Sequence, residues 1–181
     1  MKLETERLVL RPWKATDAKS LYRYAKDERV GPAAGWPPHR SEAESAEIIR
    51  TVFAQEGVFA VTLRGSDTPI GCIGLIVGSG SNFPISEQEG EISYWIGVPF
   101  WGRGLIPEAM KEVIRYGFED LGLSALWCGY FDGNEKSKRA QEKCGFRWHH
   151  TNEEQYFPLT DDRRIEHVSR LTKGEWENSA M

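Results

Sequence analysis

A turn between a strand pattern and a helix pattern is the stretch of this sequence best suited to hold an anion. Residues 89–109 read EGEISYWIGVPFWGRGLIPEA, with Gly102 and Gly104 at the turn. Glycine lets the main chain come close to a ligand, and the first N–H groups of a helix are unpaired and lie at the positive end of its dipole. Such donors suit a phosphate or pyrophosphate. Many strand-to-helix turns carry glycine for geometry alone, so the turn by itself does not identify a ligand.

Two familiar nucleotide-binding motifs do not fit this turn. A Walker loop continues from its second glycine into lysine and a hydroxyl residue, whereas Gly104 is followed by Leu105 and Ile106. A dinucleotide fingerprint needs a third glycine for helix packing, and Pro107 stands at that place. Proline suits a first helical turn, because its missing N–H would be unpaired there anyway. The sequence therefore predicts a diphosphate held mainly by the main-chain N–H groups of residues 102–106.

A second segment places polar side chains at the start of another helix. It spans residues 126–146 and reads LWCGYFDGNEKSKRAQEKCGF. Its apolar beginning predicts a short buried strand, and the Asp-Gly pair that follows predicts a turn. Asn134 is then a good helix N-cap, Ser137 lies in the first turn, and Gly145 ends the helix.

Together these two segments resemble the GNAT superfamily of acyltransferases, and within it the Rim-type branch that includes ribosomal-protein N-terminal acetyltransferases. YWIGVPFWGRGLIPEA matches the pyrophosphate loop of that branch, and NEKSKRAQEKCGF matches its N-x-x-S-x-R-x-x-E-K-x-G-F helix. The resemblance extends from the opening ETERLVLRPWKATDA to the closing IEHVSRLTKGEW. It implies an N-acetyltransferase that uses acetyl-CoA as cosubstrate. The acceptor would be a primary amine, which attacks the thioester directly in a ternary complex.

The chain departs from the wider superfamily pattern at three positions. Trp101 stands where Gln or Arg is common, and Ile106 stands where Gly or Ala is usual. Neither change removes a main-chain donor. Many members place a tyrosine four residues before the Gly-Phe pair, and this chain has Gln141 there. Ser137 is therefore the predicted proton donor to the coenzyme sulfur, against the alternative of a first-turn serine that satisfies a backbone donor.

The resemblance assigns cofactor contacts to two segments. Main-chain groups of Ile96 and Val98 would pair with the pantetheine arm, and Asn134 is a candidate for contact with it. Asn134 could equally act only as the helix cap, and both roles are compatible. The predicted pyrophosphate-binding residues are Gly102, Arg103, Gly104, Leu105 and Ile106.

A base must take a proton from the acceptor, since an ammonium group cannot attack a thioester. Glu91 shares one face of its predicted strand with Ser93 and Trp95, and this strand leads directly to the cofactor turn. We predict Glu91 as the base, with an exposed strand-edge glutamate as the alternative. His167 and His39 are the runner-up candidates, either as bases or as residues of the acceptor site.

The resemblance places the acceptor against two further segments. Trp36 and His39 would lie on one side, and Tyr156 on the other, with His167 as another substrate-binding candidate. Aromatic residues there suit either a peptide end or a small amine, and Trp36 could instead belong to the core. The sequence leaves the protein N-terminus and the small-molecule amine as alternatives.

The net charge of −4 argues against nucleic acid as a direct partner. Positive charge is nevertheless concentrated on the helix that follows Asn134, where residues 136–143 include four basic side chains. Arg139 there and Arg103 in the turn are candidates for binding the phosphates of coenzyme A. A solvated helix face is an equally good reading of this run.

Composition and patterning predict one soluble domain over residues 1–181. Of the chain, 40% is hydrophobic and 28% is charged, which is ordinary for a globular protein. We expect an α/β (α+β) fold with a mixed, mostly antiparallel central sheet of about seven strands flanked by helices. The strands are expected near 6–12, 58–64, 69–78, 90–97, 125–130, 146–158 and 164–172. The helices are expected near 16–27, 41–56, 106–120 and 134–144.

No apolar run is long enough to cross a bilayer, and no signal-peptide core is seen, so we expect a cytoplasmic protein without a membrane partner. The three cysteines have no metal spacing, and we expect no metal cofactor. The chain could be a monomer or a homodimer. A non-catalytic acyl-CoA-binding module is the remaining alternative, which the presence of Ser137 and Glu91 disfavours.

Overall fold

The computed structural model describes residues 1–179 and has a mixed α/β fold, as predicted. Its sheet has eight strands in the order β1-β2-β3-β4-β5-β6-β8-β7. The strands are β1 Leu3–Glu4, β2 Leu8–Pro12, β3 Val58–Leu63, β4 Pro69–Val77, β5 Glu89–Ile96, β6 Ala125–Phe131, β7 Arg147–Phe157 and β8 Asp162–Thr172. The helices are α1 Ala18–Ala25, α2 Gly31–Ala34, α3 Glu42–Thr51, α4 Leu105–Arg115, α5 Glu135–Lys143 and α6 Lys173–Ser179. None of the described helices is long and apolar enough to span a membrane.

The predicted strands and helices are confirmed in place, with shorter helices than expected. The helix predicted over 41–56 ends at Thr51, and the helix predicted over 106–120 ends at Arg115 and continues as a π turn over Tyr116–Asp120. The prediction missed β1, α2 and α6. Each is short, so periodicity gives little signal. For example, α2 is a single turn with proline in its first positions, and it ends at Gly35 with φ of 92°.

The chain divides into two compact units. The first contains residues 1–74 and 94–109, and the second contains residues 75–93 and those from 110 onward. The expectation of a single domain over 1–181 stays a prediction.

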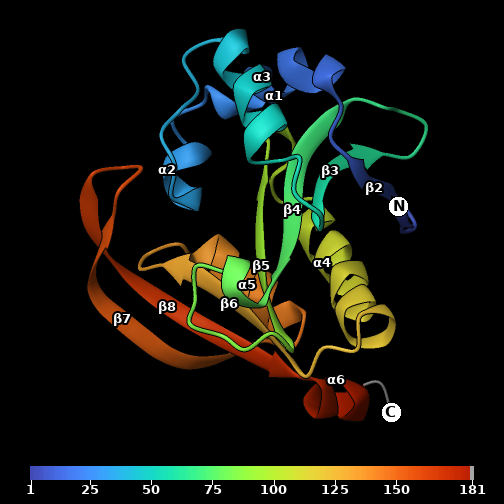
Figure 1. Ribbon diagram of the computed structural model, residues 1–181, viewed down its shortest axis with the longest axis vertical. Helices are drawn as coiled ribbons and strands as arrows, with labels where there is room; N and C mark the ends of the chain where they lie inside the picture. Colours follow the sequence, from blue (N-terminus) through green and yellow to red (C-terminus); the bar gives the residue numbers. More distant parts are fainter. Residues whose placement is uncertain (180–181) are drawn as a thin grey trace. The chain divides into compact units, whose positions relative to one another are not determined.

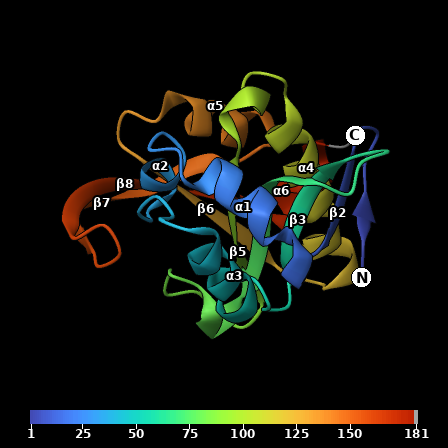
Figure 2. The same ribbon diagram turned by 90° about the horizontal axis from the view of Figure 1, so that it is seen from above.

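In the first unit, antiparallel pairing joins β2 to β1 and β3. Helices α1 and α3 pack together (Figure 2). They bury Leu21, Tyr24 and Ile49 in one apolar cluster. The α3 helix begins at a capping serine. The Ser41 side chain accepts a hydrogen bond from the N–H of Glu44 at 3.0 Å.

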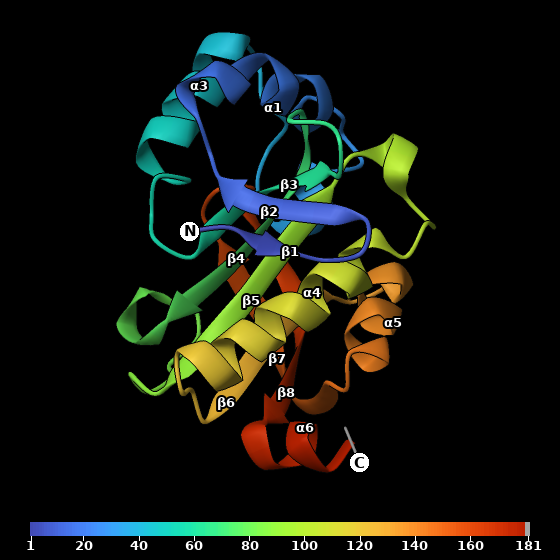
Figure 3. The same cartoon turned by 90° about the vertical axis from the view of Figure 1, so that its right-hand side faces the viewer.

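In the second unit, β6 pairs with β8, and β8 pairs with β7 to form a long hairpin (Figure 1). The pairing of β5 with β6 is parallel and runs from Glu89↔Ala125 to Glu91↔Trp127. Helix α5 packs on β6, and α6 follows β8 directly (Figure 3). Trp176 of α6 lies 5.3 Å from the Phe118 ring, centroid to centroid, which anchors this last helix.

Candidate functional site

The glycine turn before α4 has the geometry that an anion site requires. Gly102 and Gly104 both have φ of 71°, in the left-handed region that other residues rarely adopt. A Cβ on Gly102 would meet no atom within 4 Å, and one on Gly104 would meet only an Arg7 nitrogen at 3.7 Å. The turn is therefore open to a ligand, and its glycines are required by the backbone conformation.

The main-chain donors of this turn are unused. Within residues 1–179, the N–H groups of residues 102–106 donate to no acceptor. The next N–H in the helix, that of Glu108, already bonds the carbonyl of Gly104 at 3.3 Å. A run of free N–H groups at a helix start is the arrangement that binds phosphate groups in proteins.

Side chains from the N-terminal strands hold the turn in place. Glu108 accepts hydrogen bonds from the Thr5 hydroxyl at 2.6 Å and from the Arg7 main chain at 2.8 Å, and it forms an ion pair with the Arg7 side chain at 2.6 Å. Burial raises the pKa of Glu108, but these hydrogen bonds outweigh it and hold the pKa below its ordinary value. Arg7 also donates to the Arg103 carbonyl at 2.9 Å. No pattern in the sequence predicts this contact of Glu108.

Ile96 and Val98 lie between the end of β5 and the turn. Their carbonyls accept hydrogen bonds from Trp101, through its indole Nε1 to Ile96 at 3.0 Å and through its main-chain N–H to Val98 at 3.1 Å. Trp101, one of the departures from the superfamily pattern, thus fixes the segment that approaches the turn. A carbonyl has two lone pairs, so each can accept a second hydrogen bond. The guanidinium of Arg103 lies 5.5 Å from the Phe100 ring centre.

Asn134 caps α5 as predicted. Its side-chain oxygen accepts a hydrogen bond from the Ser137 N–H at 3.2 Å. The Ser137 hydroxyl accepts a long one, 3.4 Å, from the amide of Gln141. Gln141 is itself buried. Its side-chain amide donates a hydrogen bond to the Gly129 carbonyl at 3.0 Å and accepts one from the Ser169 hydroxyl. The residue that replaces the usual tyrosine therefore joins α5 to the sheet.

Glu91 is buried, with 7% of its surface exposed. Its carboxylate accepts hydrogen bonds from the Ser81 hydroxyl at 2.6 Å and from the Asn82 main-chain N–H at 2.7 Å. The alternative of an exposed edge glutamate is wrong. The carboxylate holds the segment after β4 against the sheet.

The histidine and tyrosine candidates are held by polar partners. His167 contacts Asp132 through Nε2 and Thr151 through Nδ1, both at 2.8 Å. Tyr156 is 48% exposed and donates to Asp161 at 2.7 Å. That hydrogen bond, with a smaller contribution from burial, raises the pKa of Tyr156.

Trp36 and His39 lie in the first unit beside its apolar cluster. The Trp36 ring packs against Trp95 at 5.7 Å and against His39 at 5.1 Å, centroid to centroid. His39 is 9% exposed, and its Nδ1 lies 2.8 Å from the hydroxyl of Ser45. Burial lowers the pKa of His39, against an opposing effect of Glu44, which favours the uncharged form of the ring.

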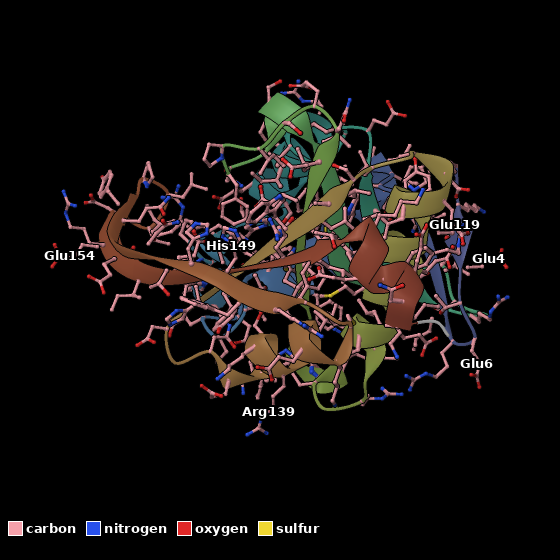
Figure 4. The ribbon with its side chains drawn as sticks, turned by 90° about the horizontal axis from the view of Figure 1, so that it is seen from below. Glu4, Glu6, Glu119, Arg139, His149 and Glu154 are labelled. Atoms are coloured by element: carbon pink, nitrogen blue, oxygen red, sulfur yellow. The ribbon has the colours of Figure 1, made fainter. Side chains whose placement is uncertain are left out.

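Arg139 is exposed on α5, and its side chain points away from the protein (Figure 4). The structure brings Asn134 and Ser137 together on α5. It places Glu91 apart from them: Gln141, which bonds Ser137, lies with Ser169 on one face of the sheet, whereas Glu91 is held by residues 81–82 on the other.

The sequence analysis did not single out Glu166. It lies on β8, accepts no hydrogen bond from a described residue, and has an unusual pKa, raised to about 7 by burial and by the charge of Glu91. Alternation along β8 places its side chain on the same face as that of the buried Val168, but no local sequence pattern shows which residues of other strands lie beside it.

Comparison with known proteins decides the family. The model of the acetyltransferase (GNAT) domain matches residues 7–147. The chain belongs to the GNAT acetyltransferase family. Among its relatives is YoaA of Bacillus subtilis, named an uncharacterized N-acetyltransferase, which is 29% identical over 150 residues, or 80% of this chain and 82% of YoaA.

Two further comparisons bear on fold and branch. A GNAT-family acetyltransferase structure from Bacillus anthracis matches with a TM-score of 0.84 at 20% identity, covering 96% of this chain and 99% of that one. YdaF of Bacillus subtilis, named "Putative ribosomal N-acetyltransferase", is 41% identical over 60 residues, 33% of each chain. The GNAT chain is thus an acyltransferase with the family's fold. GNAT acetyltransferases use acetyl-CoA, and the open glycine turn with free N–H groups fits its pyrophosphate.

Proposed function

We propose that this GNAT protein transfers the acetyl group of acetyl-CoA to a primary amine, and that this amine is the N-terminal α-amine of a protein of the ribosome. The assignment of acetyl-CoA as the cosubstrate rests on the row of unused N–H groups over residues 102–106, beside glycines that leave the turn open. The relationship to YdaF favours the ribosomal acceptor. The Rim-type motif around Asn134 and Ser137 supports the same branch.

The proposed cofactor contacts follow the motif residues. The pyrophosphate binds the N–H groups of residues 102–106, and the pantetheine pairs with the main chain of Ile96 and Val98. Asn134 holds the start of α5 and contacts the pantetheine. Arg139, exposed and without an ion-pair partner among the described residues, adds positive charge for a phosphate group.

The proposed catalytic groups are side chains of the second unit. Ser137 donates a proton to the departing sulfur. Glu91, predicted as the base, supplies a negative charge that favours removal of a proton from the acceptor amine. The proposed acceptor-binding residues are Trp36 and His39 of the first unit and Tyr156 and His167 of the second. The buried His39 and the hydrogen-bonded His167 act by shape and hydrogen bonding.

The test measures acetyl-CoA binding and acetyl transfer separately. Calorimetry with acetyl-CoA examines the turn, and release of free coenzyme A thiol is then followed with a panel of peptides carrying ribosomal-protein N-termini and with small amines. We expect turnover with the N-terminal peptides. Turnover with small amines alone would replace the ribosomal acceptor by a small-molecule one. Binding without any turnover would leave an acyl-CoA-binding module.

A further inference from the structure

Two carboxylates lie on the same face of the second unit's sheet, on either side of β6. Strand pairing places Glu91 of β5 beside Trp127 and Glu166 of β8 beside Phe131. Trp127, Gly129 and Phe131 alternate onto one face of β6, so both carboxylates belong to that face. The segment over residues 81–83 covers it, because it donates hydrogen bonds to Glu91 and contacts the Gly129 position through Phe83.

Gly129 leaves the space that the Glu166 carboxylate occupies. A Cβ at this position would lie 2.8 Å from Oε2 of Glu166 and 3.0 Å from Cζ of Phe83. Any larger residue would displace the carboxylate or the ring. The position of Glu166 over the middle of β6 therefore depends on a glycine in that strand.

The two carboxylates differ in their partners. Glu91 is fixed by the Ser81 hydroxyl and the Asn82 main chain. Among residues 1–179, nothing donates a hydrogen bond to Glu166 or forms an ion pair with it. A carboxylate that accepts no hydrogen bond from the described residues, beside a second carboxylate that accepts three, is the one of the two that is better placed to take a proton from a ligand.

Burial first, and then the charge of Glu91, raise the pKa of Glu166 to about 7. Other polar or charged groups on or beside this face do not pair with it. From β8 they are Arg164, whose guanidinium lies 4.6 Å from the Phe131 ring centre, and Arg170, which lies 5.5 Å from that of Trp127. From the other elements they are Ser81, Asn82, His149, His150 and Asn152, and the Cys128 thiol lies on the opposite face of β6.

We propose that Glu166 is the base that takes the proton of the acceptor amine, and that Glu91 is a positioning residue that acts on Glu166 from the same face of the sheet. This assignment rests on the proposed acetyl transfer. It replaces direct proton transfer to Glu91, whose Oε2 accepts two short hydrogen bonds from the 81–82 segment and whose Oε1 accepts a longer one, 3.4 Å, from the Asn82 side chain.

The proton and electron balance is simple. The acceptor arrives as R–NH3⁺ and gives one proton to the Glu166 carboxylate. The freed lone pair forms the N–C bond to the thioester carbonyl, and the C=O pair moves to oxygen. When it returns, the C–S bond breaks and its electrons leave with sulfur, which takes a proton from Ser137. The two strands β5 and β6 pair only from Glu89↔Ala125 to Glu91↔Trp127, so a thioester held where they part meets Ser137 from one face of the sheet and Glu166 from the other. The nitrogen releases its second proton to solvent, from which Ser137 recovers its own, and Glu166 then loses its proton to solvent too.

Three variants separate the roles. Glu166→Gln removes the base, Glu91→Gln removes the charge that acts on it, and Glu153→Gln is the matched control, because Glu153 is an exposed carboxylate on β7. We expect kcat/KM for the best peptide acceptor to rise with pH to a plateau above about pH 7 in the wild type. Glu166→Gln should lower the plateau roughly 10²–10⁴-fold, the usual contribution of a general base. Glu153→Gln should leave the profile unchanged.

Glu91→Gln gives the decisive signature. Removing a like charge lowers the pKa of Glu166, so the rising limb should move to lower pH while the plateau is largely kept. The acceptor's own pKa is the same for both enzymes and cannot produce this shift. Loss of the plateau in Glu91→Gln, with wild-type turnover in Glu166→Gln, would return the base to Glu91 and overturn the proposal.

A titration without turnover distinguishes this proposal from the proposed function. In protein labelled with ¹³C at glutamate carboxyl carbons, the Glu166 signal is the one missing from Glu166→Gln. We expect its midpoint near pH 7 in the wild type and lower in Glu91→Gln. A midpoint in the ordinary glutamate range, about 4.3, overturns the carboxylate pair. The expected midpoints without turnover of any amine would instead overturn acetyl transfer, and the catalytic role with it.

If Glu166→Gln fails to fold, Gly129→Ala tests the same site. Its Cβ would push the Glu166 carboxylate without removing a charge. We expect a fall in kcat/KM with unchanged affinity for acetyl-CoA. Unchanged kcat/KM in a folded Gly129→Ala would count against Glu166 as the base.

Discussion

At the scale of single residues, Ser137 is the sharpest test of the acid assigned to the leaving group. Charge builds on sulfur as the C–S bond breaks, so a hydroxyl donor helps mainly in the transition state. We expect Ser137→Ala to lower kcat more than it changes KM for acetyl-CoA. A thiol is already a fair leaving group, so the loss should lie near 10²-fold, the low end for general-acid catalysis.

Thermal stability measured on the same Ser137→Ala protein tests the alternative, a purely structural role for this residue. The Ser137 N–H, not its hydroxyl, completes the Asn134 cap, and the hydroxyl accepts a long hydrogen bond, 3.4 Å, from Gln141. A protein whose Tm falls while kcat stays at the wild-type value would assign Ser137 to structure alone.

At the scale of elements, the glycine turn before α4 yields a prediction with an internal control. Gly104→Val places a β-branched side chain at φ of 71°, which distorts the N–H row that we assign to pyrophosphate. We expect acetyl-CoA affinity to fall at least about tenfold, since each hydrogen bond to a charged group is worth about 1.5–3 kcal/mol.

Gly122→Val is the matched control for that experiment. Gly122 has φ of 68°, with open space where a Cβ would lie, in a turn that follows the π turn after α4. It should lose similar stability through the same backbone strain and keep its affinity for acetyl-CoA in calorimetry. Equal affinity in the two variants would remove the pyrophosphate from the turn.

The contact of Glu108 with Thr5 and Arg7 predicts a pH-dependent stability. The pKa of Glu108 is lower in the folded protein than in the unfolded chain, so its contribution is present above the unfolded pKa and is lost as pH falls through the folded pKa. Glu108→Gln should therefore be less stable than the wild type at pH 7, and the difference should shrink toward pH 3. Urea unfolding of both proteins at the two pH values measures it, and a constant difference would contradict the electrostatic origin.

The sequence predicted the long elements well and the short ones poorly, for physical reasons. Strand β4 is apolar on both faces, and its burial confirms that it is central. The capping serine of α3 and the glycine turn before α4 are local signals, and both appear in the structure. In contrast, α2 is a single turn between Gly31 and Gly35, too short for any periodicity.

Glu166 was missed for a different reason. Its environment comes from the register between β6 and β8, which brings a strand glycine under its carboxylate, and from Glu91 on another strand. Those partners lie far apart in the sequence, so no local pattern encodes them. The motif around Asn134, by contrast, is carried by one helix start and was readable from the sequence.

At the scale of the whole molecule, the proposed functions are divided between the two compact units. The glycine turn belongs to the first unit, and Ser137, Glu91 and Glu166 belong to the second. The chain passes between the units three times, within β4, within β5 and within α4. Unfolding one unit therefore interrupts two strands and a helix that continue into the other, so we expect the two to melt together.

Acetyl-CoA should therefore stabilise the protein in a single cooperative transition. A ligand that binds only the folded state adds about 2.7 kcal/mol at 100 times its Kd, and for a chain of this length that raises Tm by roughly 5–10 °C. Differential scanning calorimetry at increasing acetyl-CoA should show one peak that moves upward, while Gly104→Val should show little movement at the same concentration. Two peaks, of which only one responds to acetyl-CoA, would show that the units unfold independently. That result would confine the stabilisation to the unit that holds the cosubstrate, and a transition that ignores acetyl-CoA at saturating concentration would contradict binding to the folded protein altogether.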